Sequence, residues 1–307
     1  MFDLEEFLSE RHHNFKKINP DYPSLFETIQ PLQVAEKGSL IFINKPTEKT
    51  FDVLEKTVAS VVLAEKQWGE ENRKKLESFN KAFFLVRSPR LIITELLKHL
   101  YPEDDAVAPE GIHPSAQIHP EADIHSTVAI GQFCIIGKCR IGEGSVVGPF
   151  SVVKDNVTIG KNVTVREYCL LGGAGFGFER DDHAVPQRIP HIGSVVIEDN
   201  VEIFPYVNID RGTLSETRIK KNTKIDHYCH IGHNTVIGEN CIITAGTVFC
   251  GGCSIGDRTW TGVGSIVKQK VQVGNDVVLG LGAVVIKNVE DNQIVGGVPA
   301  RLIRVIK

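Results

Sequence analysis

The stretch at residues 225–252, IDHYCHIGHNTVIGENCIITAGTVFCGG, decides the fold. It divides into units of six residues that open on the apolar side chains Ile225, Ile231, Ile237, Ile243 and Phe249. In a parallel β-helix built from such hexads, three units complete one coil. Residues that are eighteen positions apart therefore lie on neighbouring coils of the same face.

One such pair has the groups that acyl transfer needs. His233 and Gly251 are eighteen positions apart, so we expect them to lie one strand spacing apart, about 4.8 Å. An imidazole can take up a proton, and no side chain obstructs the backbone N–H of a glycine. A base beside an N–H donor for an oxyanion is the minimum that acyl transfer requires. The spacing thus favours His233 as a general base and Gly251 as the oxyanion donor.

The hexad continues through most of the chain. It starts at Ile112 and runs to Val285, with apolar first positions and small or β-branched fifth positions that fill a narrow triangular coil. Five of the seven cysteines occupy fifth positions, which indicates packing rather than metal ligation: Cys134, Cys169, Cys229, Cys241 and Cys253. We predict a left-handed parallel β-helix over residues 106–307.

Two insertions interrupt the hexads, at residues 172–194 (GGAGFGFERDDHAVPQRIPHIGS) and at residues 210–218 (DRGTLSETR). Long insertions in a solenoid collect on one face, which is often the binding face. The glycine cluster of the first insertion is not a phosphate-binding P-loop, because no Gly-Lys-Ser/Thr follows it.

Residues 1–105 lack the hexad and read as a small α/β domain. Apolar, β-rich runs at residues 39–44, 59–64 and 82–86 alternate with helical patterns at residues 51–57 and 67–79. Ser88 and Pro89 predict the N-cap and first residue of a helix that continues to Leu100. Residues 101–105 read as a linker. The fold class is therefore mainly β, a β-helix preceded by an α/β domain.

Composition excludes several classes of function. The chain has 307 residues and a net charge of −4, which gives no electrostatic basis for binding nucleic acid or an anionic membrane. Its start lacks the apolar core of a signal peptide, and no run of eighteen apolar residues predicts a membrane span. Unpaired cysteines suit a reducing compartment, so we expect a cytoplasmic protein.

The histidines leave a metal site open as an alternative. His227, His230 and His233 are close in sequence, and β-helical carbonic anhydrases bind zinc through histidines shared across a trimer interface. His227 and His233, however, occupy the same hexad position on neighbouring faces, so we expect them to diverge and expect no metal. Asp226 lies seven positions before His233 and either orients its ring or serves as a turn residue at a corner.

The C-terminal sequence GLGAVVIKNVEDNQIVGGVPARLIRVIK ends the coils. Backbone amides of its Gly-Gly-Val-Pro-Ala-Arg turn, together with Lys287, Arg301 and Arg304, suit phosphate or pantetheine groups. The alternative is a capping strand with ordinary surface charge.

Three segments resemble the N-acyltransferase family of lipid A biosynthesis that acts on UDP-3-O-(3-hydroxyacyl)glucosamine. They are GFGF at residues 175–178, VEIFPYVNIDRGTLSET at residues 201–217 and KIDHYCHIGHNTVIGEN at residues 224–240. SLIFINKP and ASVVLAEK, near the N-terminus, are similar to the uridine-binding module of that family. The resemblance covers most of the chain.

The resemblance implies His233 as general base, Asp226 as its supporting carboxylate and Gly251 as the oxyanion amide. It implies that the nucleotide-sugar contacts the following residues: Phe42, Asn44, Phe176, Phe178, Asp210, Arg211, His227 and Asn234. The ending is similar to that of coenzyme A-dependent sugar acetyltransferases. That likeness implies an acyl-donor site formed by Lys270, Lys287, Gly296, Arg301 and Arg304.

Lys270 stands near the place of a second active-site histidine in the family, and Glu48 stands about where a tyrosine stacks on uracil. We therefore expect an N-acyltransferase on a nucleotide-linked amino sugar, with acyl-CoA as donor. The alternative is the lipid A enzyme proper, with an acyl carrier protein as donor. No cofactor is expected.

Pockets form where β-helix faces meet, so we expect a homotrimer with active sites between subunits. A carbonic anhydrase-like metalloenzyme and a non-catalytic scaffold are the alternatives from other classes of function.

Overall fold

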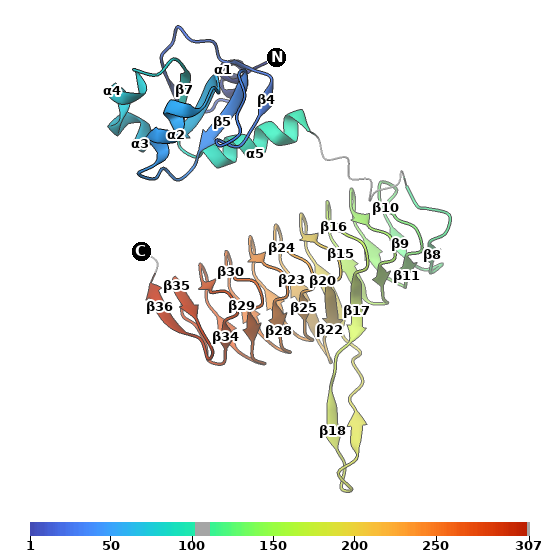
Figure 1. Cartoon of the computed structure of the whole chain (residues 1–307). Coiled ribbons are helices and arrows are strands. Elements are labelled where there is room, and N and C mark those ends of the chain that lie inside the picture. The colour runs from blue at the N-terminus through green and yellow to red at the C-terminus, as the bar shows by residue number, and fades with distance from the viewer. Residues whose placement is uncertain (102–110, 306–307) are drawn as a thin grey trace. The chain divides into compact units, whose positions relative to one another are not determined.

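A computed structural model describes residues 1–101 and 111–305. The chain forms two compact units, Met1–Asp104 and Asp105–Lys307, coloured blue to cyan and green to red in Figure 1. Most of the linker predicted at residues 101–105 lies outside the described residues.

The first unit is a five-stranded sheet with helices packed on it. The strand order is β2-β7-β6-β5-β4, in which β2 alone is antiparallel to its neighbour. These strands are β2 (Phe15–Ile18), β4 (Thr28–Ile29), β5 (Ser39–Ile43), β6 (Val61–Glu65) and β7 (Ala82–Val86). The helices are α1 (Leu4–Glu10), α2 (Thr50–Lys56), α3 (Lys66–Glu71), α4 (Arg73–Leu76) and α5 (Pro89–Leu100). β1 (Phe2–Asp3) and β3 (Leu25–Phe26) form a separate, short antiparallel pair.

The side chains of the central strands alternate between two buried clusters, as expected for a sheet covered on both faces. Leu63 and Phe84 pack in one cluster, whereas Val62 and Phe83 pack in the other. Ser88 caps α5 as predicted, because its Oγ accepts from the N–H of Leu91 at 3.4 Å. The helix predicted at residues 67–79 is broken into α3 and α4 instead.

The break lies at Asn72, which has non-helical backbone angles of φ −108° and ψ 16°. Its side-chain amide donates to the carbonyl of Trp68 at 2.8 Å, so a side chain competes for an acceptor of the helix. This competition ends α3 at Glu71, less than two turns after its start.

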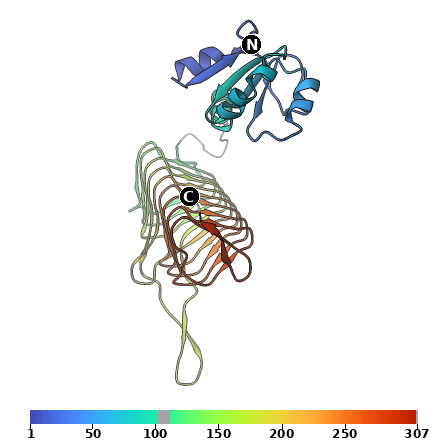
Figure 2. The ribbon, with the colours of Figure 1, turned by 90° about the vertical axis from the view of Figure 1, so that its left-hand side faces the viewer.

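The second unit is a parallel β-helix, which confirms the hexad prediction; Figure 2 shows its coils stacked behind one another. Within residues 111–305 its strands form three faces. Face 1 contains β10 (Ala129–Ile130), β13 (Val146–Val147), β16 (Thr164–Val165), β21 (Glu202–Ile203), β24 (Lys224–Ile225), β27 (Ile242–Ile243), β30 (Trp260–Thr261), β33 (Val278–Leu279), β35 (Gln293–Gly296) and β36 (Arg301–Val305).

Face 2 contains β8 (Gln117–Ile118), β11 (Ile135–Ile136), β14 (Val152–Val153), β17 (Leu170–Ala174), β22 (Asn208–Arg211), β25 (His230–Ile231), β28 (Val248–Phe249), β31 (Ile266–Val267) and β34 (Val284–Val285). Face 3 contains β9 (Asp123–Ile124), β12 (Arg140–Ile141), β15 (Val157–Ile159), β20 (Ser194–Ile197), β23 (Glu216–Ile219), β26 (Val236–Ile237), β29 (Ser254–Ile255) and β32 (Gln272–Val273). Within the three faces strand pairing is parallel except for β36, which turns back on β35 and ends face 1.

The interior of the coil is filled by the two predicted columns. From Ile130 onward the first residues of the hexads, such as Ile225 and Ile231, are buried, and so are the fifth-position cysteines. Burial raises the pKa of the Cys169 and Cys253 thiols to about 12. These thiols therefore stay protonated near neutral pH and act as small apolar side chains.

One corner of the coil carries an aromatic stack. Five rings follow one another along it with centroids 5.0–5.4 Å apart: Phe133, Phe150, Tyr168, Tyr206 and Tyr228. Each has a left-handed backbone, with φ between 57° and 63°. A non-glycine residue in that region costs about 1–2 kcal/mol. Ring stacking contributes about 0.5–1.5 kcal/mol per pair and offsets much of that cost.

The insertion at residues 172–194 forms an arm that projects from the β-helix between β17 and β20 (Figure 1). Its outer part is an antiparallel pair, β18 (Phe178–Arg180) and β19 (Pro186–Arg188), whose side chains are all exposed. The second insertion is shorter than predicted. Asp210 and Arg211 still belong to β22, and only residues 212–215 loop out before β23.

Candidate active site

His233 lies at the corner between β25 and β26, and its contacts fix which ring nitrogen carries the proton. Its Nδ1 lies 2.9 Å from Oδ1 of Asn234, and the same oxygen accepts from the backbone N–H of Thr213 at 3.0 Å. A backbone N–H can only donate, so this atom of Asn234 is the amide oxygen. Nδ1 of His233 therefore donates, and Nε2 carries the lone pair of a base.

Asn234 is itself held firmly. Its backbone N–H donates to Oγ1 of Thr217 at 2.8 Å, and its Nδ2 donates to Oγ of Ser215 at 2.8 Å. The backbone has φ of 62°, a left-handed conformation that asparagine tolerates better than most residues. The orienting amide is thus anchored by the loop at residues 212–215.

Gly251 packs against the imidazole of His233. His230 pairs with Val248, so the eighteen-residue register places Gly251 beside His233, as predicted. A methyl group at Gly251 would lie only 2.5 Å from Nε2 of His233. The N–H of the next residue, Gly252, donates to the carbonyl of His233 at 2.7 Å. Among residues 1–101 and 111–305, the N–H of Gly251 has no hydrogen-bond acceptor.

Within the described chain Asp226 does not contact His233, so its predicted support of that ring stays a prediction. Oδ1 of Asp226 lies 2.7 Å from Nδ1 of His227 and accepts from the N–H of His227 at 2.8 Å. Its Oδ2 accepts from the N–H of Ala245 at 3.0 Å. Burial raises the pKa of Asp226, but these hydrogen bonds outweigh it and hold the pKa below its usual value.

The physical reason is the length of the hexad. Seven positions exceed one hexad by one, so Asp226 and His233 lie at different corners of the coil. Asp226 and His227 share the corner between β24 and β25, where the ring of His227 lies 5.2 Å from that of Phe204. A role of His227 in substrate binding stays a prediction.

A second polar cluster lies on face 2. Asp210 is buried, and its Oδ1 accepts from Nδ2 of Asn208 at 2.8 Å. The same Nδ2 lies 3.0 Å from Nδ1 of His230, and Nε2 of His230 lies 3.8 Å from Oδ2 of Asp210. Asp210 therefore has internal partners, although it pairs with Gly173 at the base of the arm. Contact of Asp210 with a substrate stays a prediction.

Arg211 holds the arm in place. Its Nε donates to the carbonyl of Gly172 at 2.7 Å, and its Nη2 donates to the carbonyl of Asp155 at 3.1 Å. These bonds favour a structural role over the predicted contact with a substrate. Phe176 and Phe178 follow on the arm with ring centroids 4.9 Å apart, and the side chain of Phe176 is 90% exposed. Their predicted substrate contacts remain untested.

Sequence reasoning missed Thr213 and His191. Oγ1 of Thr213 lies 3.3 Å from Nδ1 of His233 and 3.1 Å from Oδ1 of Asn234. The ring of His191 lies 4.9 Å from that of His233, at an angle of 71°. Both residues come from the insertions, where the hexad register does not apply. The only signal in the sequence was that long insertions in a solenoid collect on one face, which is often the binding face.

The residues predicted for the acyl donor lie in two places. The N–H of Lys270 donates to the carbonyl of Gly251 at 3.1 Å, so Lys270 lies at the same corner as His233, one coil beyond Gly251. Gly296 pairs with Arg301 where β36 turns back on β35. Lys287, Arg301 and Arg304 are exposed. Their binding of a donor stays a prediction.

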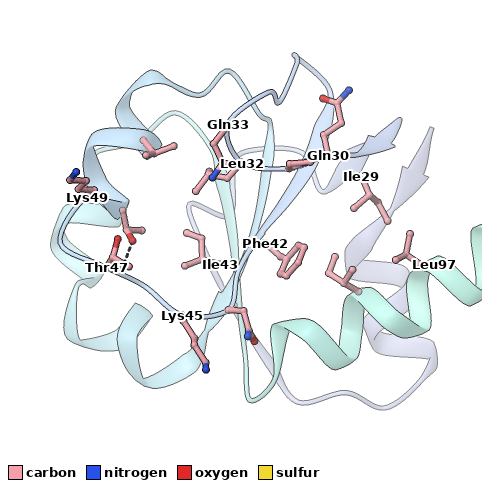
Figure 3. A pocket seen from close by; sticks show the side chains of 15 residues that line it. Ile29, Gln30, Leu32, Gln33, Phe42, Ile43, Lys45, Thr47, Lys49 and Leu97 are labelled. Atoms are coloured by element: carbon pink, nitrogen blue, oxygen red, sulfur yellow. Dashed lines mark hydrogen bonds between the residues drawn. The ribbon is translucent and has the colours of Figure 1, made fainter. Parts of the chain in front are cut away.

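The first unit contains a separate cavity of about 800 Å³, shown in Figure 3. It opens at the carboxyl end of β5, where ligands of parallel sheets commonly bind. Phe42 presents its ring to the cavity, and Asn44, Lys45 and Thr47 also line it. The predicted nucleotide contacts Phe42 and Asn44 thus line one cavity.

In the described part of the chain, no three His, Cys, Asp or Glu side chains converge as ligands for a metal ion. The histidines at residues 227, 230 and 233 take separate partners instead. Within the same residues, no helix is both long and apolar enough to cross a membrane.

Comparison with known proteins points to one family. The model of the bacterial transferase hexapeptide (six repeats) matches residues 138–173 and 216–251. UDP-3-O-acylglucosamine N-acyltransferase of Methylococcus capsulatus is 36% identical over 262 residues, which cover 78% of this chain and 72% of that protein. A Gloeobacter violaceus protein of the same name is 31% identical and covers 70% of this chain.

The match is shorter on some relatives. It covers 64% of the Gloeobacter violaceus protein, and 42% of the Campylobacter lari UDP-3-O-acylglucosamine N-acyltransferase, which is 31% identical over 44% of this chain. The matched chain thus spans less than two thirds of these relatives.

Solved structures show a related fold. UDP-N-acetylglucosamine acyltransferase of Francisella novicida has a TM-score of 0.56 and 26% identity, covering 63% of this chain and 70% of that one. The Campylobacter jejuni protein of that name has a TM-score of 0.56 and 25% identity, covering 63% and 74%.

Proposed function

The chain belongs to the UDP-3-O-acylglucosamine N-acyltransferase family, and on that premise we propose that it transfers an acyl group from a thioester to the amine of a nucleotide-linked amino sugar. The observation that carries the proposal is the tautomer of His233. A ring with a lone pair on Nε2, next to a glycine N–H that has no acceptor among the described residues, has the two groups that this reaction needs.

The reaction proceeds by direct attack, without an acyl-enzyme. The uncharged sugar amine attacks the carbonyl carbon of the thioester, and Nε2 of His233 takes a proton from the nitrogen as the C–N bond forms. The N–H of Gly251 donates to the oxyanion of the tetrahedral intermediate. When the C–S bond breaks, the imidazolium returns the proton to the leaving thiolate. The products are an amide and a free thiol.

Asn234 and Thr213 keep a proton on Nδ1 of His233 throughout the reaction. The amide oxygen of Asn234 accepts from Nδ1 and stabilises the imidazolium once Nε2 is protonated. Because the amide is neutral, it orients the ring without the full charge of a carboxylate. Asp226, bound to His227, takes no part in this step.

The cavity of the first unit is the proposed nucleotide site. Its apolar wall at Phe42, with polar groups at Asn44 and Thr47, suits a base that stacks and hydrogen-bonds at its edge. The curated relatives are named for a UDP-linked acylglucosamine, so that sugar is the first acceptor to test. Other nucleotide-linked amino sugars are alternatives.

A homotrimer is supported by the contrast between two faces. The outward side chains of face 2 are mostly apolar: Ile135, Val152, Leu170, Val248, Ile266 and Val284. Those of face 3 are mostly polar: Asp123, Arg140, Thr158, Arg218, Ser254 and Gln272. We therefore place face 2 against the neighbouring chains. The corner of His233 borders face 2, so each active site lies between subunits.

The acyl donor carries a phosphopantetheine arm, on coenzyme A or on an acyl carrier protein. Lys270, one coil beyond Gly251, and the exposed Lys287, Arg301 and Arg304 supply positive charge for its phosphates. Gly296 lies beside Arg301 and allows a close approach of the donor. The test is a thioester-cleavage assay in which both donors are offered with UDP-3-O-acylglucosamine. Thiol release that depends on the sugar supports the proposal, and its absence with both donors contradicts it.

A further inference from the structure

His191 is a buried histidine that the proposed mechanism leaves unused. It lies where the arm returns to the β-helix, and only 8% of its surface is exposed. Its Nδ1 lies 2.9 Å from the carbonyl oxygen of Ile189, which can only accept, so Nδ1 carries a proton. The neutral ring then has its lone pair on Nε2. Among the residues the structure describes, this nitrogen has no hydrogen-bond partner.

The side of the His191 ring that carries Nε2 lies next to Gly175, which also adjoins the ring of His233. The rings of His191 and His233 meet edge to face, with centroids 4.9 Å apart. A methyl group at Gly175 would lie 2.8 Å from Nε2 of His191 and 2.9 Å from Cδ2 of His233. A methyl group at Gly177 would lie 2.9 Å from Cε1 of His191. Two glycines of the arm thus leave just the space that the His191 ring fills.

His233 is therefore enclosed from two directions. Gly251 packs on the ring from the next coil, and His191 packs on it from the arm. A buried acceptor without a donor is unfavourable, and such groups are rare unless they serve a purpose. Here the nearest group that changes its charge during the proposed reaction is the imidazole of His233.

We infer that His191 is a positioning residue for His233, an inference that rests on the proposed function. Its ring keeps the imidazole against Gly251, so that Nε2 of His233 stays directed at the reacting amine. Its lone pair lies beside a ring that becomes positively charged when it takes the proton. In a site of low dielectric, this arrangement stabilises the imidazolium more than water would. No bond to His191 forms or breaks.

Two substitutions test this role. H191F keeps a ring of similar size but removes the lone pair, and we expect kcat to fall about tenfold with KM for both substrates changed less than about twofold. H191Q supplies an amide whose NH₂ group can donate to the carbonyl of Ile189 and whose oxygen can accept, as Nε2 of His191 can. With this variant kcat should lie within about threefold of the wild-type value. H183F is the matched control, because His183 is exposed on the same arm and should leave kcat unchanged.

The double variant H191F/H233A separates this inference from the proposed function. If His191 acts through His233, H191F lowers kcat in the wild type but has no effect in the H233A background. If H191F lowers kcat equally in both backgrounds, or does not lower kcat at all, the inference is overturned. A loss of kcat in H233A would in that case still support the proposed function. Wild-type turnover of H233A overturns the proposed function itself. If both H191F and H191Q fail to fold, the role of His191 is packing, and the inference is also overturned.

Discussion

Nδ1 of His233 lies 2.9 Å from the amide oxygen of Asn234, and this contact decides which nitrogen of the ring can act as a base. The adjacent residue in the sequence, rather than a distant carboxylate, orients the imidazole. An asparagine suits this position for two reasons. Its side chain accepts a hydrogen bond from the ring, and its backbone adopts a φ of 62°.

Replacement of Asn234 by glycine should therefore slow catalysis without disturbing the coil. N234G keeps a backbone that is free to adopt the left-handed conformation but loses the acceptor for Nδ1. General base catalysis contributes about 10²–10⁴-fold, and we expect N234G to lose about 10–100-fold of kcat with little change in KM. Steady-state kinetics with UDP-3-O-acylglucosamine and an acyl thioester measure the effect.

N240G is the matched control for this prediction. Asn240 has φ of 57° at another corner of the same coil, where its Oδ1 accepts from Asn222. A loss of kcat in N240G as large as that in N234G would mean that corner geometry, and not the ring contact, sets the rate.

Substitution of Gly251 by alanine should abolish activity sterically. The added methyl group would lie 2.5 Å from Nε2 of His233, so the ring must leave its position. We expect kcat to fall by at least about 100-fold. At Gly280, in contrast, the nearest atom to an added methyl group would be 3.3 Å away, so G280A should retain activity. Near-normal turnover of G251A would show that catalysis does not depend on the packing of His233 against Gly251.

The register of eighteen residues made His233 and Gly251 predictable, because the hexad period alone determines which residues become neighbours on a face. The columns of the core were predictable for the same reason. Helix α5 was also predictable, since Ser88 and Pro89 are local signals that no tertiary contact overrides.

The partners of His233 were not predictable in this way. Thr213 and His191 come from insertions, whose path depends on contacts such as those of Arg211 with Gly172 and Asp155. Asp226 was expected beside His233 because closeness in sequence was read as closeness in space. At a β-helix corner, residues seven positions apart diverge, and Asp226 instead binds the neighbouring His227.

In the first unit, truncation of Phe42 should weaken nucleotide binding. Stacking of a base on an aromatic ring contributes about 1–3 kcal/mol, so F42A should raise the Kd for UDP by about 5–150-fold. Calorimetric titration of the whole chain measures it. Phe15 is also a partly buried ring of the same cluster but does not line the cavity, so F15A is the control. Unchanged UDP affinity in F42A would place the nucleotide elsewhere.

A charge on face 2 should dissociate the proposed trimer. Ile266 is 40% exposed in the single chain, so I266K should fold, but it would bury a lysine between subunits. We expect the mass measured by light scattering to fall from that of three chains to that of one. Q272K also adds a lysine, but on face 3, and should leave the mass unchanged. A wild-type protein with the mass of one chain would contradict the assembly.

The most direct test of the account is the rate of acyl transfer to UDP-3-O-acylglucosamine by H233A, measured beside H119A. His119 is an exposed histidine of the first coil, so H119A should retain the wild-type rate. H233A should fold normally and lose about 10²–10⁴-fold of kcat, because the general base is gone. A correctly folded H233A with wild-type turnover would contradict the assignment of His233 as the base.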